Sequence, residues 1–130
     1  MNRRDYLAEL LRLYIEQPDT PDVSRRSDWA VAADLYQRAI PLDTVAHTIR
    51  LATLRRLQQD PADPPLAPVR SLAYYRTALA ALTPHDLEPG YVTYVAHQHA
   101  LRLSQLRANP KLDDSKTRSD RQNPALPDRR

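Results

Sequence analysis

Apolar residues recur along the chain at intervals of three and four positions, which is the spacing of helices buried on one face. The first segment with this pattern is Arg4–Gln17, where Leu7, Leu10, Leu11 and Tyr14 fall on one side. Polar residues occupy the other positions, and a proline follows the segment. The pattern predicts an amphipathic helix, with Asn2 or Asp5 as its N-cap.

Four further segments repeat the helical spacing and are separated by short or proline-rich connectors. We predict helices over Asp28–Ala39, Pro41–Gln59, Val69–Ala81 and Tyr91–Ala108. Ser24 or Ser27 is the expected N-cap of the first of these helices, and Ser71 that of the third. The predicted buried face of Asp28–Ala39 consists of Trp29, Ala32, Ala33, Tyr36 and Ala39 or Ile40, widened by Val31 and Leu35.

The helix predicted over Pro41–Gln59 is apolar on two sides. One side carries Leu42, Val45, Ile49, Ala52 and Thr53, and the nearly opposite side carries His47, Leu51 and Leu54. A helix that is apolar on both sides is usually covered on both sides, so we predict that it is the central helix. Its first side should meet the helix before it. Its second should meet a later helix or another protein chain, which makes His47, Leu51 and Leu54 a candidate partner interface.

The short connection before Pro41–Gln59 also fits a helix-turn-helix, in which this helix would enter DNA. Its candidate base-reaching residues are Arg50, Arg55 and Arg56, which point in different directions around the helix axis. We therefore favour a scaffold role for it.

Composition supports an all-α fold. The chain of 130 residues has one Gly and 12 Pro, and hairpin dipeptides such as Asn-Gly are missing. We predict one domain of about five helices over residues 1–108. Residues 109–130 are too polar to bury a core, so we predict a flexible basic tail there. The connector Asp60–Pro68 is a stiff spacer or, alternatively, a proline motif for a partner.

Charge is distributed unevenly between the predicted domain and the predicted tail. The chain has 19 basic and 16 acidic residues; residues 107–130 hold 7 and 4 of them, so residues 1–106 hold 12 of each. Arg supplies 17 of the basic residues, and Arg suits bidentate contacts with phosphate. A GC-rich genome also encodes Arg in preference to Lys. The candidate nucleic-acid-binding residues are Arg25, Arg26, Arg50, Arg55, Arg56, Arg70 and Arg76, with Tyr74 or Tyr94 as a stacking platform.

The residues that carry catalytic or metal chemistry do not form a motif. No Cys is present, and His97 and His99 point to opposite sides of one helix, which prevents them from sharing a metal ion. A single Gly excludes phosphate-cradling loops. We predict a protein that is not an enzyme and has no cofactor or metal. Without a run of about 18 apolar residues, no membrane association is expected, and a cytoplasmic location is predicted.

Two segments of the chain carry a resemblance to a known family. A helix with Trp29 is followed by AIPLDTVAHTIRLATLRR and, after a loop, by VRSLAYYRTALAAL. This resembles the small helical module of DnaD-like and related replication-initiation proteins of phages and mobile elements. The residues that match are Leu42, Val45, Ile49 and Ala52 in the first segment and Tyr75 and Leu79 in the second. The resemblance covers residues 29–82 and implies a non-enzymatic accessory role in DNA replication or in a mobile element.

These observations predict a nucleic-acid-associated accessory protein, as a component of replication, of a mobile element or of a ribonucleoprotein complex. Its Arg side chains would contact backbone phosphates without reading sequence. The alternative is a helical adaptor between proteins, or a small structural subunit of a larger complex.

Overall fold

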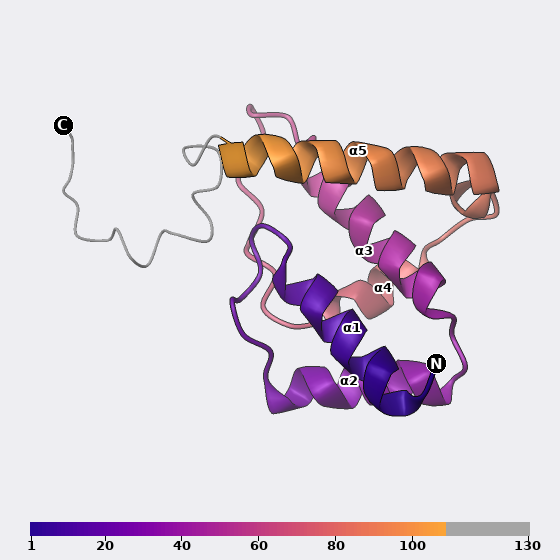
Figure 1. Cartoon of the computed structure of the whole chain (residues 1–130). Helices are drawn as coiled ribbons and strands as arrows, with labels where there is room; N and C mark the ends of the chain where they lie inside the picture. The colour runs from indigo at the N-terminus through magenta and orange to yellow at the C-terminus, as the bar shows by residue number, and fades with distance from the viewer. Residues whose placement is uncertain (109–130) are drawn as a thin grey trace, which may run out of the picture.

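The structure is a computed structural model, and it describes residues 1–108, which form helices and connecting segments without strands (Figure 1). The predicted all-α class is therefore confirmed. The predicted tail, residues 109–130, lies outside the described residues. The helices are α1 (Arg3–Ile15), α2 (Arg26–Gln37), α3 (Leu42–Leu57), α4 (Tyr74–Ala80), the short 3₁₀ helix η1 (His85–Leu87) and α5 (Pro89–Ala108).

Helix α3 lies at the centre of the fold, as its two apolar sides predict. It packs against α1, α4 and α5, and α5 lies across it on the side away from α1 and α2 (Figure 1). The first apolar side of α3 was expected to meet α2. It meets α1 instead, because α1 lies between α3 and α2. The connection from α2 to α3 is short, yet α2 packs mainly against α1.

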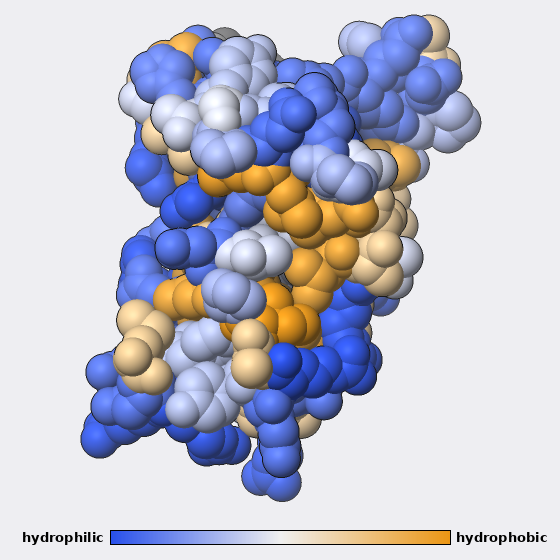
Figure 2. Space-filling model, turned by 90° about the vertical axis from the view of Figure 1, so that its right-hand side faces the viewer, coloured by the Kyte–Doolittle hydropathy of each residue, from blue (hydrophilic) through white to orange (hydrophobic). Residues whose placement is uncertain are grey.

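The main core joins α1, α2, α3 and the segment that leads into α4. Its fully buried centre includes Leu10, Tyr14, Ile49 and Leu72. At its edge, the Tyr6 hydroxyl donates a hydrogen bond of 2.8 Å to the backbone oxygen of Ile40. Figure 2 shows that apolar side chains also reach the surface on one face, in a band across the middle of the molecule.

A second, smaller core lies between α3 and α5. It contains Leu51 and Leu54 of α3 and Val95 of α5. His47 is buried near them, and its Nε2 donates to the backbone oxygen of Asp86 at 2.7 Å. The three residues predicted as a partner interface, His47, Leu51 and Leu54, are thus covered by η1 and α5 of the same chain.

The N-terminus of α1 is capped as predicted, but that of α2 is not. Asn2 Oδ1 accepts a hydrogen bond of 2.8 Å from the backbone N–H of Asp5. Neither Ser24 nor Ser27 caps α2; the N-cap is Arg25, whose backbone N–H donates to the Asp28 carboxylate at 2.9 Å. This carboxylate, at the third position of the helix, satisfies the N–H of the N-cap residue, which is the reciprocal half of a capping box rather than the bond that a serine hydroxyl would make.

Helix α2 ends two residues earlier than predicted because Ala39 adopts a left-handed backbone conformation, with φ of 60°. The N–H of Ala39 donates to Tyr36 O at 2.9 Å, and that of Ile40 donates to Leu35 O at 3.2 Å. This pairing closes a helix C-terminus in the Schellman manner, usually with Gly in the left-handed position. Pro41 then serves as the N-cap of α3.

The orientation predicted for α2 is wrong at Trp29. The side chain expected in the core is 45% exposed, and the buried residues of the helix are Asp28, Val31, Ala32 and Leu35. Apolar spacing alone cannot show this, because it takes no account of a buried carboxylate. Asp28 is fully buried, and with it inside, the next residue along the helix points outward.

Helix α4 begins at Tyr74, five residues later than predicted. The residues before it use their backbone N–H groups elsewhere: Val69 donates to Asp19 O at 2.9 Å and Leu72 donates to Asp28 Oδ1 at 2.9 Å. The predicted cap Ser71 instead accepts from the N–H of Ala73 at 3.1 Å, before the helix starts. Contacts with distant segments therefore replace the first turns of the predicted helix.

Candidate nucleic-acid interface

The buried carboxylate of Asp28 connects two segments that are far apart in the sequence. Its Oδ2 accepts the backbone N–H of Arg25, and its Oδ1 accepts the backbone N–H of Leu72, each at 2.9 Å. The hydroxyl of Ser71 also lies 3.4 Å from Oδ1. Because Arg70 directly precedes Ser71, these contacts hold it near the first turn of α2. The structure thus places the backbone of Arg70 near the start of α2, where Arg25 and Arg26 lie.

Three arginines at this place, Arg25, Arg26 and Arg70, are exposed. In the part of the chain that the structure describes, none of their guanidinium groups forms an ion pair with a carboxylate. Trp29 follows Arg26 by three residues within α2, which places these two on the same side of the helix, and Arg25 is the N-cap directly before it. We call the four residues Arg25, Arg26, Trp29 and Arg70 the Arg–Trp surface. The sequence pattern identified its three arginines but assigned Trp29 to the core.

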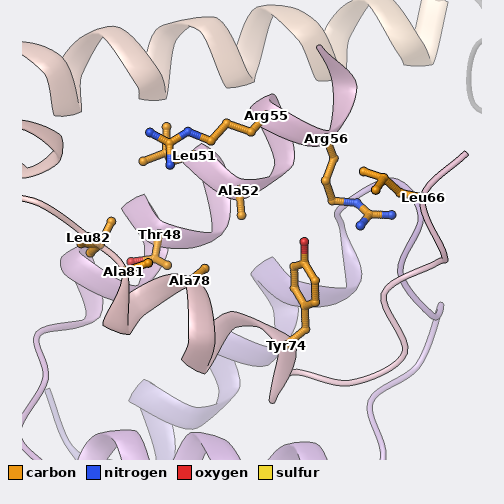
Figure 3. Close-up of a pocket in the computed structure, with 10 residues that line it drawn as sticks. All are labelled: Thr48, Leu51, Ala52, Arg55, Arg56, Leu66, Tyr74, Ala78, Ala81 and Leu82. Carbon is orange, nitrogen blue, oxygen red and sulfur yellow. The ribbon is translucent and has the colours of Figure 1, made fainter. Parts of the chain in front are cut away.

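Three other predicted residues, Arg55, Arg56 and Tyr74, line a groove between α3 and α4 with a volume of about 290 Å³ (Figure 3). Small side chains such as Ala52 and Ala78 leave the space open. In Figure 3 the Tyr74 ring points from α4 toward the guanidinium of Arg56, which lies 5.7 Å from the ring centroid.

The arginines of this groove are already engaged within the chain. Arg56 is largely buried, forms an ion pair with Asp19 and donates to the backbone oxygen of Ala67 at 2.8 Å. Arg55 lies 3.3 Å from Asp86. The backbone N–H of Thr83 and the guanidinium of Arg55 lower the pKa of Asp86, so that it stays ionised beside Arg55. A phosphate entering the groove would have to displace these carboxylates.

The two remaining predicted arginines lie elsewhere. Arg76 of α4 is 4.0 Å from Asp34, which also pairs with Arg38 at 3.1 Å. Arg50 is partly buried on α3, where its charge acts on His99 of α5. The eight residues predicted as one nucleic-acid-binding set therefore divide into the groove, the Arg–Trp surface and two separate positions. Of the predicted arginines, those of the Arg–Trp surface are the ones that are exposed and have no ion pair among the described residues.

A buried polar network holds the helices together behind these surfaces. His99 Nε2 donates to Gln17 Oε1 at 2.6 Å, and the Thr53 hydroxyl donates to the same oxygen at 3.1 Å. The Gln17 amide donates to the backbone oxygen of Leu13 at 2.8 Å. Burial, together with the charges of Arg50 and Arg107, lowers the pKa of His99 to about 4, so this histidine is neutral at pH 7. The network joins the end of α1 to α3 and α5.

Within residues 1–108, no three His, Cys, Asp or Glu side chains gather as a metal site would require. The helices of this part of the chain include none with the length and hydropathy of a membrane span. Comparison of the chain with protein-family models, with curated proteins and with solved structures found no match. The resemblance to replication-initiation modules accordingly stays a prediction from the sequence.

Proposed function

We propose that this protein is a nucleic-acid-associated accessory protein that contacts backbone phosphates through arginine side chains and does not read base sequence. The observation that supports the proposal is the Arg–Trp surface, where Arg25, Arg26 and Arg70 are exposed and their guanidinium groups form no ion pair among the described residues. The predicted role in replication, in a mobile element or in a ribonucleoprotein complex rests on the sequence resemblance. The adaptor role likewise remains a prediction.

The chemistry of these side chains suits phosphate. A guanidinium presents paired N–H donors that match two phosphate oxygens, and it keeps its charge at any physiological pH. Because these arginines have no ion pair within the described chain, binding phosphate does not require an internal pair to break. Asp28 holds the backbones of both segments in place, which reduces the ordering cost of binding.

The proposal is tested by fluorescence anisotropy with labelled single- and double-stranded DNA and RNA over a range of salt concentrations. The test variant is Arg25→Gln/Arg26→Gln/Arg70→Gln. A matched control is Arg3→Gln/Arg4→Gln/Arg102→Gln, which removes the same charge from exposed arginines elsewhere, including another adjacent pair at the start of a helix. Binding should weaken as salt rises, and the test variant should lower the slope of log K against log[salt] by about 2 to 3.

The control should retain most of the binding of the unchanged protein. If no nucleic acid forms a salt-dependent complex, the proposal is wrong. If test and control variants lose binding equally, net charge rather than the Arg–Trp surface determines it. Removal of residues 109–130 should also reduce binding, because these residues carry most of the excess of positive charge.

A further inference from the structure

We infer that Trp29 is a stacking platform for an unpaired base, so that the Arg–Trp surface takes a single-stranded segment of nucleic acid in preference to a duplex. This inference rests on the proposed function and specifies its ligand. Trp29 is the only Trp of the chain and is 45% exposed. A surface Trp offers a large flat ring on which any of the four bases can stack.

The indole of Trp29 differs from the other exposed rings in having no ring partner among residues 1–108. Tyr74 is packed edge-on against Tyr75 at 5.1 Å and lies under Arg56. Tyr94 is stacked on Tyr91 at 6.2 Å, with 22° between the ring planes. The two tyrosines named from the sequence as platforms therefore already have aromatic contacts within the chain. Trp29 has none.

The position of Trp29 beside arginines fits a single strand of nucleic acid, because the arginines can contact its phosphates while Trp29 contacts a base. Arg26 lies one turn earlier on the same side of α2, Arg25 is the N-cap before it, and the backbone of Arg70 lies near that turn. Consecutive phosphates of an extended strand can contact these guanidinium groups while a base turns onto the indole. A duplex keeps its bases stacked inside, so it offers the phosphates but not the base.

The test uses the full chain and three probes: an oligothymidylate of about 12 nucleotides, the corresponding duplex, and a strand of the same length that has abasic sites in place of thymidines. Because Trp29 is the only Trp, the intrinsic fluorescence of the protein reports on this residue alone. Stacking should quench it with the oligothymidylate and not with the other two probes. Anisotropy of the labelled probes measures binding separately.

Trp29→Ala should weaken binding of the oligothymidylate about 5- to 150-fold, which corresponds to the usual cost of losing one stacked base. It should leave binding of the duplex and the abasic strand unchanged, and Trp29→Phe should restore part of the loss. Tyr94→Ala is the matched control, because Tyr94 is also exposed, at 57%, but lies on α5. This variant should bind all probes as the unchanged protein does.

Two outcomes would overturn the inference. If the probes bind by anisotropy but the fluorescence of Trp29 stays the same with the oligothymidylate, the indole does not contact a base. If Trp29→Ala weakens the binding of all three probes equally, the residue supports the shape of the Arg–Trp surface and does not stack on a base. Both results leave the phosphate-binding function in place. If no probe binds at low salt, the proposed function fails and this inference fails with it.

Discussion

The buried His99 predicts a loss of stability in mild acid that can be calculated from the structure. Its pKa is lowered from 6.5 to about 4 by burial and by the charges of Arg50 and Arg107. The unfolded chain therefore binds a proton near pH 6.5 while the folded chain does not. The stabilisation is complete above the unfolded pKa and is lost as the pH falls toward the folded pKa.

The magnitude follows from the two pKa values. Between about pH 7.5 and pH 5 the free energy of unfolding should fall by about 2 kcal/mol, and the loss should level off near about 3 kcal/mol below pH 4. Asp86 and Glu9 also have pKa values that are lowered by their hydrogen-bond partners, but they affect the free energy of unfolding at a lower pH. Their stabilising effect is lost only below their ordinary pKa values of 3.8 and 4.5.

The assay is urea unfolding followed by helical circular dichroism at several pH values between about 7.5 and 5. In His99→Gln, the amide N–H can still donate to Gln17 Oε1 but cannot take up a proton, so the pH dependence in this range should largely disappear. His97→Gln, an exposed position two residues earlier on α5, should keep it. If His99→Gln and the unchanged protein lose the same stability between these pH values, the buried His99 is not its source.

Four other substitutions test separate parts of the fold by the same unfolding assay. Asp28→Ala should cost about 2 to 4 kcal/mol, because it leaves the buried N–H of Leu72 and the partly buried N–H of Arg25 without acceptors; an unchanged midpoint would contradict this. Ala39→Gly should stabilise by about 1 kcal/mol by relieving the left-handed φ of 60°, and a destabilised variant would argue against strain there. Tyr14→Phe should be neutral or stabilising, because the buried Tyr14 hydroxyl has no hydrogen-bond partner among residues 1–108; a loss above about 1 kcal/mol would show that it has one. Ile49→Asp should unfold the chain by burying a carboxylate in the main core, and a folded, helical variant would refute the central position of α3.

Apolar periodicity predicted the parts of this fold that depend on local pattern. It located all of the long helices and showed that α3 is covered on two sides, because both properties follow from side-chain spacing along one element. It failed where distant polar contacts decide. The orientation of Trp29 and the late start of α4 both follow from the buried Asp28, two of whose partners, Ser71 and Leu72, lie more than 40 residues further along the chain.

The candidate site shows the same limit. Sequence could select Arg25, Arg26 and Arg70 by residue type, but it could not separate them from Arg55 and Arg56. That distinction depends on Asp86 and Asp19, which reach these two arginines only in the folded chain. Likewise, no pattern along the sequence pairs Gln17 with His99, which are 82 residues apart.

If the proposed phosphate binding takes place, the contact made by Asp28 links it to the folding equilibrium. Arg25 and Arg70 are neighbours only while this carboxylate holds both segments, so a strand that contacts both binds the native chain and not the unfolded one. By mass action, such a ligand at about 100 times its Kd raises the free energy of unfolding by about 2.7 kcal/mol. A shift in melting temperature on adding an oligonucleotide would therefore detect occupancy without any label, and a peptide containing either segment alone would lack the complete surface.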